Sequence, residues 1–147
     1  MPGLVIPETI LDAIIAQARA AAPLEACGIL SGRDGRVLLA HAMANADQSA
    51  DHFSMEPREQ FAVAKKIRAA GHETLAIYHS HPSSPARPSE EDIRLAYTPD
   101  VVHVVLSLQE PNRPVVRGFY IRDAGVEPAP VEIVPGSPRE GDDGYEH

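Results

Sequence analysis

The chain has one cysteine, no tryptophan and only two lysines among its 147 residues. The single thiol, Cys27, cannot form an internal disulfide or supply a four-thiolate zinc site. Lysine and arginine together number 13 against 21 acidic residues, which leaves a formal net charge of −8. A nucleic-acid binder needs a dense basic patch to neutralise phosphates, and the sequence contains no dense basic run. Nucleic acid is therefore not expected as a partner.

Long apolar runs are also missing. None approaches the ~18 residues needed to cross a bilayer, and the opening segment MPGLVIPETI lacks the basic and apolar regions of a secretory signal. We therefore expect a cytoplasmic protein with no membrane partner. With 44% hydrophobic and 23% charged residues, the composition is typical of a globular domain. We expect one domain over residues 1–135, followed by an acidic, disordered tail over residues 136–147.

The apolar pattern predicts a mixed α/β domain. Helical spacing predicts helices over 7–22 and 57–70, and a third, short helix over 89–95. The Asp34–Gly35 pair predicts a hairpin between the first two strands, and prolines in the last strand favour a position at a sheet edge. Apolar and β-branched runs predict extended segments or strands at 28–31, 37–39, 52–55, 75–78, 101–108, 115–121 and 126–134.

Two histidines, His79 and His81, stand one residue apart where a predicted strand ends. Side chains at this spacing on a strand point to the same face, so both imidazoles can reach one ion. Asp92 falls in the first turn of the third helix, where its carboxylate can turn back toward the strand end. Two imidazoles and one carboxylate leave a fourth tetrahedral position for water, which is typical of a catalytic zinc site. Taken alone, Ser89 and Asp92 also have the spacing of a helix capping box, and capping is compatible with metal binding.

Other patterns are weaker. His72 and Glu73 begin an H-E-x-x-H motif, but Ala76 stands where the second histidine is required. A buried packing role is favoured for Cys27 over a nucleophilic one. Two histidines and a carboxylate also occur in non-haem iron oxygenases, although there the second histidine is usually distant in sequence. The remaining histidines have no ligand spacing and are expected to be ordinary surface or core residues: His41, His52, His103 and His147.

The run 79–82, with Ser89 and Asp92 after it and Glu25 before it, resembles the motif of the JAMM (MPN-plus) family of zinc metallopeptidases. The resemblance extends over nearly the whole chain, and every position of the family motif is filled. It implies a curved mixed β-sheet flanked by helices, similar to the fold of cytidine deaminases.

The resemblance also implies a role for each motif residue. The residues implied as Zn²⁺ ligands are His79, His81 and Asp92. Glu25 would act as general base toward the water that zinc activates, and Ser89 would hydrogen-bond that water or the oxyanion. Spacing alone does not select Glu25, because Glu73 is an equal candidate, and the family pattern decides between them.

JAMM peptidases cleave after the C-terminal tails of ubiquitin-like proteins, isopeptide bonds included. The resemblance therefore implies a zinc-dependent peptidase or isopeptidase that hydrolyses the bond after the Gly-Gly tail of a ubiquitin-like or sulfur-carrier protein. A chain of 147 residues has little room for the insertions of eukaryotic deubiquitinases, which favours the compact prokaryotic stand-alone type. Two alternatives stay open, a catalytically idle MPN scaffold and a non-haem iron enzyme. The intact motif argues against the scaffold.

Overall fold

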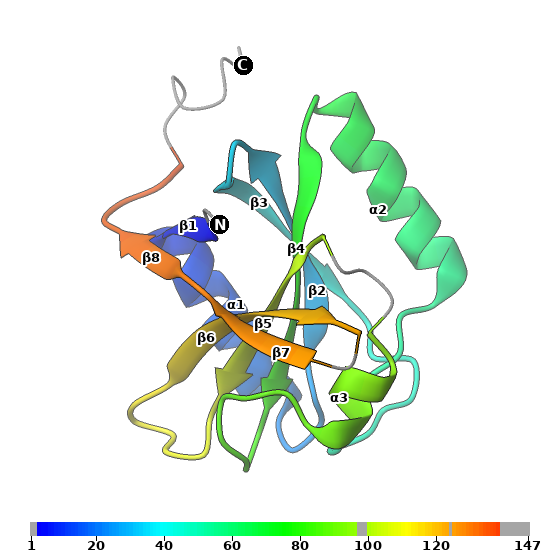
Figure 1. Ribbon diagram of the computed structural model, residues 1–147, viewed down its shortest axis with the longest axis vertical. Helices are drawn as coiled ribbons and strands as arrows, with labels where there is room; N and C mark the ends of the chain where they lie inside the picture. Colours follow the sequence, from blue (N-terminus) through cyan, green and yellow to red (C-terminus); the bar gives the residue numbers. More distant parts are fainter. Residues whose placement is uncertain (1–2, 97–99, 124, 139–147) are drawn as a thin grey trace.

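The computed structural model describes residues 3–96, 100–123 and 125–138. Within these residues, one eight-stranded mixed sheet has the strand order β7-β6-β5-β4-β2-β3-β1-β8. This architecture confirms the expected mixed α/β class with a curved sheet and flanking helices (Figure 1). The elements follow one another as β1 (Leu4–Pro7), α1 (Glu8–Ala21), β2 (Cys27–Arg33), β3 (Arg36–Met43), α2 (Pro57–Ala69), β4 (Glu73–His81), α3 (Glu90–Arg94), β5 (Val102–Ser107), β6 (Val115–Arg122), β7 (Gly125–Ala129) and β8 (Val131–Val134).

The two ends of the sheet are bridged by one extended segment. β7 pairs antiparallel with β6 at one end, and β8 pairs parallel with β1 at the other. Only Pro130 separates β7 from β8, and its carbonyl accepts a 2.9 Å hydrogen bond from the Leu4 amide. The segment therefore crosses from one end of the curved sheet to the other (Figure 1). The predicted single strand at 126–134 is thus two strands, each terminal in the strand order, as its prolines indicated.

A helix packs on each face of the sheet. Ile14 and Ala18 of α1 belong to the larger apolar cluster, together with Leu30 of β2. Val63 and Ile67 of α2 form a smaller cluster on the other face, with Cys27 as its β2 member. Adjacent positions of a strand alternate between faces, so β2 contributes to both clusters. Because the sheet is covered on both faces, most side chains of the central strands β2, β4 and β5 are buried.

Most predicted elements are confirmed, with two differences. The Asp34–Gly35 hairpin forms with both residues at positive φ, 53° and 77°, as this turn chemistry requires. Residues 52–55 belong to no strand, and β1 was not predicted. Four residues carry too weak a pattern to indicate a strand, and β1 is defined by its pairing with β8, more than 120 residues away.

The proposed boundary between domain and tail is not decided by the fold. β8 ends at Val134, and the Gly136 carbonyl accepts a 3.2 Å hydrogen bond from the Thr9 amide. Most of the expected acidic tail lies outside the described residues. Among the helices that the structure describes, none is both long and apolar enough to cross a membrane.

Candidate metal centre

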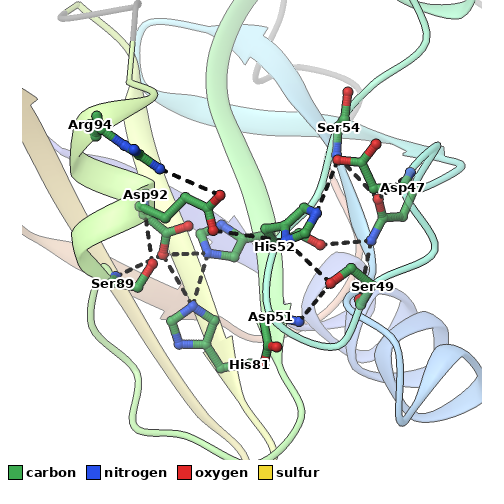
Figure 2. Close-up of polar contacts among 12 residues, drawn as sticks. Asp47, Ser49, Asp51, His52, Ser54, His81, Ser89, Asp92 and Arg94 are labelled. Atoms are coloured by element: carbon green, nitrogen blue, oxygen red, sulfur yellow. Dashed lines mark hydrogen bonds and ion pairs between the residues drawn. The ribbon is translucent and has the colours of Figure 1, made fainter.

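Three ligand atoms form a nearly equilateral triangle at the end of β4. His79 Nε2 lies 3.1 Å from His81 Nε2, and Asp92 Oδ2 lies 3.1 Å and 3.2 Å from these two nitrogens (Figure 2). Ligands at about 2.0–2.1 Å from a tetrahedral zinc lie about 3.3 Å from one another. The histidine–aspartate triangle, His79, His81 and Asp92, therefore has the dimensions of one face of such a site. Among the described residues, it is the one group of three or more potential ligand side chains placed in this way.

Local structure explains the placement of these side chains. The two histidines project from the same face of β4, and Asp92 is brought to them by the start of α3. Ser89 caps this helix: its Oγ accepts from the Asp92 amide at 3.0 Å, and its own amide donates to Asp92 Oδ2 at 2.8 Å. The capping box and the triangle thus share one carboxylate oxygen. Both sequence interpretations of the Ser89–Asp92 spacing describe the same geometry.

The electrostatic environment of the three triangle side chains favours a bound cation. Burial alone would raise the pKa of Asp92, but hydrogen bonds from His79 and His81 hold it well below its usual value. Burial would lower the pKa of His81, and its hydrogen bonds with Asp92 and the Pro85 carbonyl outweigh that effect and raise it. His81 Nδ1 donates to the Pro85 carbonyl at 2.9 Å, so when His81 is neutral its Nε2 carries no proton and directs its lone pair into the triangle, as a metal ligand must. Two imidazoles and a carboxylate are the ligand types that zinc binds.

The loop between β3 and α2 completes the wall beside the triangle. Phe53 stacks on the His79 ring with centroids 4.7 Å apart. Asn45 anchors this loop, because its Nδ2 donates to the carbonyls of Glu25 and His52 at 3.2 Å and 3.0 Å. Sequence reasoning missed Asn45 and Phe53. No spacing rule could have indicated them, since their contacts join segments far apart in the chain.

His52 connects the same loop to α3. Its Nε2 lies 3.3 Å from Asp47 Oδ2, and its Nδ1 lies 3.8 Å from Glu91 Oε1 (Figure 2). His52 was expected to be an ordinary surface or core residue. Its side chain is 38% exposed, and it links the loop to α3 without contributing a ligand atom to the triangle.

Glu25 has the properties of a buried base. Its side chain is buried, and its Oε1 has no hydrogen-bond partner among the described residues. Burial is the largest cause that raises the pKa of Glu25, which reaches about 8, and the charges of His81 and Asp92 act on it in opposite directions. Ser80, between the two histidines, fixes the adjoining backbone by accepting from the Ala26 amide at 2.8 Å. An unpartnered carboxylate near the triangle has the oxygen atoms that a water molecule there would contact.

Two other sequence candidates contribute no ligand atom to this centre. Glu73 is exposed at the first residue of β4 and pairs with Gly32, at the opposite end of the strand from His81. Its position removes the ambiguity that spacing left between the two glutamates. Cys27 is fully buried, and burial raises the pKa of its thiol to about 12. Its Sγ faces the carbonyls of Met43 and Ala44, in agreement with a packing role.

A cavity of about 510 Å³ opens beside the triangle. His79 and Asp92 form part of its wall, so a molecule in the cavity would lie against the ligand atoms. Much of the remaining wall is apolar and comes from the loop before α2, from the segment around α3, and from β4, β5 and β6. Its apolar residues are Phe53, Met55, Ile77, Pro88, Leu95, Ala96, Val105 and Ile121.

Comparison with known families agrees with this centre. The sequence profile described as prokaryotic homologues of the JAB domain matches residues 7–119. The chain belongs to this family. The match includes the triangle, Glu25 and Ser89, and it makes the chain a JAMM/MPN domain of the prokaryotic type.

Characterised relatives within the family are peptidases. The CysO-cysteine peptidase of Mycobacterium tuberculosis is 36% identical over 133 residues, which cover 89% of this chain and 91% of the relative. The desampylase of Haloferax volcanii is 35% identical over 103 residues, covering 65% of this chain and 74% of the relative. This chain is accordingly a hydrolase of the peptidase class.

Solved structures resemble the fold over nearly its full length. A protein from Desulfitobacterium hafniense superposes with a TM-score of 0.85 at 40% identity, covering 98% of this chain and 99% of the other. A JAB1/MPN domain protein from Archaeoglobus fulgidus superposes with a TM-score of 0.58 at 25% identity, covering 89% and 99% of the two chains. The curved sheet and its flanking helices are therefore those of a JAB1/MPN domain.

Proposed function

We propose that the chain is a zinc-dependent peptidase that hydrolyses the peptide or isopeptide bond after the C-terminal Gly-Gly tail of a ubiquitin-like or sulfur-carrier protein. The observation that carries the proposal is the triangle with a buried carboxyl group, Glu25, beside it. A closed structural zinc site would instead have four protein ligands. Here three ligands leave one position open.

Zinc, when bound, supplies Lewis acidity, which makes water a stronger acid and a carbonyl group a better electrophile. The residues that would hold it are His79, His81 and Asp92. The mutual distances of their ligand atoms, and the lone pair that His81 Nε2 directs inward, fit this assignment.

Glu25 would move the proton. In the proposed reaction, its carboxylate accepts a proton from water as the water oxygen bonds to the scissile carbonyl carbon. Glu25 then gives that proton to the amine nitrogen as the carbon–nitrogen bond breaks. The raised pKa of Glu25, about 8, suits a group that must both take and return a proton near neutral pH. A metal ion at the triangle would add positive charge and lower this value toward neutrality.

Ser89 would stabilise the oxyanion. Its Oγ accepts a hydrogen bond from the Asp92 amide, which leaves the hydroxyl proton available for donation toward the centre. In this role it would contact the negative charge that develops on the carbonyl oxygen of the scissile bond. The same hydroxyl caps α3, so it has a structural role as well.

The proposed substrate class agrees with the names of the relatives. Besides the CysO-cysteine peptidase and the desampylase, a protein of Thermus thermophilus described as a probable TtuB-protein conjugate cleaving protease is 33% identical over 94 residues. A Gly-Gly sequence also suits the centre physically. The three side chains of the triangle are only 4–7% exposed, so an approaching backbone must come close, and glycine has no Cβ to obstruct it.

The test uses a sulfur-carrier protein from the same organism, extended after Gly-Gly in two ways. One substrate carries a single C-terminal cysteine, and the other is joined to a lysine side chain by an isopeptide bond. We expect cleavage after the second glycine, loss of activity with chelator, and recovery with Zn²⁺. Metal analysis of protein purified without added metal distinguishes zinc from iron. Full activity after chelation, or iron as the metal that restores it, contradicts the proposal.

A further inference from the structure

A second cavity, of about 370 Å³, lies beside the loop that follows the histidines of β4. Three arginines line it, each from a different segment: Arg87 from the loop before α3, Arg113 from the loop between β5 and β6, and Arg117 from β6. One acidic residue, Glu110, shares the wall. This arginine cavity is unusual in a chain with 13 basic and 21 acidic residues.

Hydrogen bonds fix the arginine cavity relative to the triangle. The His81 carbonyl accepts from the Leu108 amide at 3.0 Å, while the His81 ring donates to the Pro85 carbonyl at 2.9 Å. Ser107 Oγ donates to the Ser84 carbonyl at 2.6 Å, which joins β5 to the same loop. The two segments that form the cavity walls, the end of β5 and the loop after β4, are thus hydrogen-bonded to His81 or to each other. Whatever binds the cavity binds next to the triangle.

The arginines are available to a partner. All three side chains are exposed, and among the described residues none of them forms an ion pair. A further hollow, beside α3, is mainly acidic. Asp51, Glu90 and Glu91 line it together with Arg94, whose Nη2 lies 3.7 Å from Glu91 Oε2. The surface around the triangle is therefore divided into a basic side and an acidic side, which can orient a charged partner.

Resting on the proposed function, we infer that the arginine cavity docks an acidic face of the folded carrier protein whose Gly-Gly tail enters the triangle. A folded partner fits the cavity better than a small anion does. The three arginines come from separate segments and are exposed, so they suit a broad acidic surface better than one compact anion. Val115, 40% exposed, adds apolar surface of the kind that a protein interface covers.

The experiment reverses the charge of the cavity without altering the triangle. The variant is R87E/R113E/R117E, and the control is R36E/K65E/R68E, which changes the net charge equally. Arg33, in the hairpin that holds Arg36, bonds to the Gly71 carbonyl just before β4. The control positions are thus separated from the arginine cavity by the nine residues of β4, about 26 Å of strand. Circular dichroism and zinc content check that both variants are folded and loaded.

Two substrates are compared: the carrier protein extended by cysteine, and a short peptide that ends in the same Gly-Gly-Cys sequence. We expect the cavity variant to lower kcat/KM for the carrier by roughly tenfold or more, mainly through KM, and to weaken its dependence on salt. The control variant should keep the wild-type values. Neither variant should change hydrolysis of the peptide, which has no folded face to dock.

Equal losses on the carrier and the peptide would overturn the inference, because the arginines would then bind the tail or its terminal carboxylate. Unchanged kinetics on both substrates would overturn it as well. Competitive inhibition of peptide hydrolysis by millimolar inorganic phosphate, lost in the cavity variant, would instead assign the cavity to a small anion.

Binding separates this inference from the proposed function. The Kd of zinc-loaded E25Q for the extended carrier is measured with and without the three arginine reversals. If wild-type protein cleaves no carrier, a Kd that still rises by roughly tenfold on reversal supports docking while the hydrolytic proposal fails. An unchanged Kd rejects docking whether or not the bond is cleaved.

Discussion

Two histidine clusters lie toward opposite ends of β2 and β4. One is the triangle, where a carboxylate joins two imidazoles. In the other, Ser31 Oγ lies 2.8 Å from His41 Nε2 and 3.4 Å from His72 Nδ1. Both clusters include buried imidazoles, from β4 in the triangle and from the residue before β4, His72, in the other. They differ in the group between the rings: an anion in one and a hydroxyl in the other.

The group between the rings determines whether the pKa of the neighbouring histidine is raised or lowered. In the triangle, the hydrogen bonds that His81 donates to Asp92 and to the Pro85 carbonyl outweigh burial and raise the pKa of His81. In the serine-centred cluster, burial lowers the pKa of His41, and the nearby charges of Lys66 and His72 lower it further. Paired histidines are therefore not sufficient for a cation site. A carboxylate between them converts a place that repels positive charge into one that attracts it.

The largest effect should separate the two clusters directly. H81A removes one ligand of the triangle, so we expect zinc to be lost and activity to fall below about 1% of wild type. H72A removes an imidazole from the serine-centred cluster and should keep both. Metal content per chain and turnover of the extended carrier are the measurements. Stoichiometric zinc in folded H81A would mean that the triangle is not the site.

The next effect is catalytic and leaves metal in place. E25Q keeps the size of the side chain but cannot accept a proton, so turnover should fall by about 10²–10⁴-fold with zinc content unchanged. E73Q is the matched control at the far end of β4 and should behave as wild type. A wild-type rate in E25Q combined with a slow E73Q would show that the base had been assigned to the wrong glutamate.

A smaller loss is expected at Ser89. S89A removes the proposed oxyanion donor, which should lower kcat by about 10²-fold. It also removes the cap of α3 and should destabilise the protein by about 1 kcal/mol. S83A changes an exposed serine of the same loop and is the control. If S89A loses stability while kcat stays at the wild-type value, its hydroxyl serves only as a cap.

The smallest effect is the pH dependence of stability in metal-free protein, which should differ in sign between the clusters. The raised pKa of His81 stabilises the fold below pH 6.5, and that contribution is lost as pH rises above this value. The lowered pKa of His41 has the opposite consequence, a loss of stability as pH falls below 6.5.

Thermal melts between pH 5 and 8 with chelator test this difference. H41Q should flatten the acid side of the profile and H81Q the alkaline side. Profiles that both variants flatten on the same side would contradict the electrostatic contrast between the clusters.

The sequence predicted the parts of the centre that depend on local spacing. His79 and His81 share a strand face, and Asp92 follows from the helix start that Ser89 caps. Spacing did not select Glu25. The resemblance to the JAMM family favoured it over Glu73, and its burial beside the triangle supports that choice. Spacing rules relate residues only a few positions apart, so they predicted the three ligands but could not select the distant Glu25.

Contacts between distant segments were beyond prediction. The hydrogen bond from the Ala26 amide to Ser80 spans 54 positions, and Asn45 bonds to a carbonyl 20 positions away. The same limit applies to the fold. Periodicity located α1 and α2 to within a residue or two, whereas β1 exists through its partner near the other end of the chain.

The pairing of β1 with β8 has a consequence for biosynthesis. β1 can pair with β3 early, but its second partner, β8, is made more than 120 residues later, and only then can the extended segment around Pro130 span the sheet. A nascent chain that has completed β6 already contains every residue of the triangle, but β1 and β6 still have one open edge each, at the two ends of the sheet. Such edges invite pairing with other chains. Addition of β7 and β8, more than formation of the metal centre, is then the step that covers the open edges of β6 and β1.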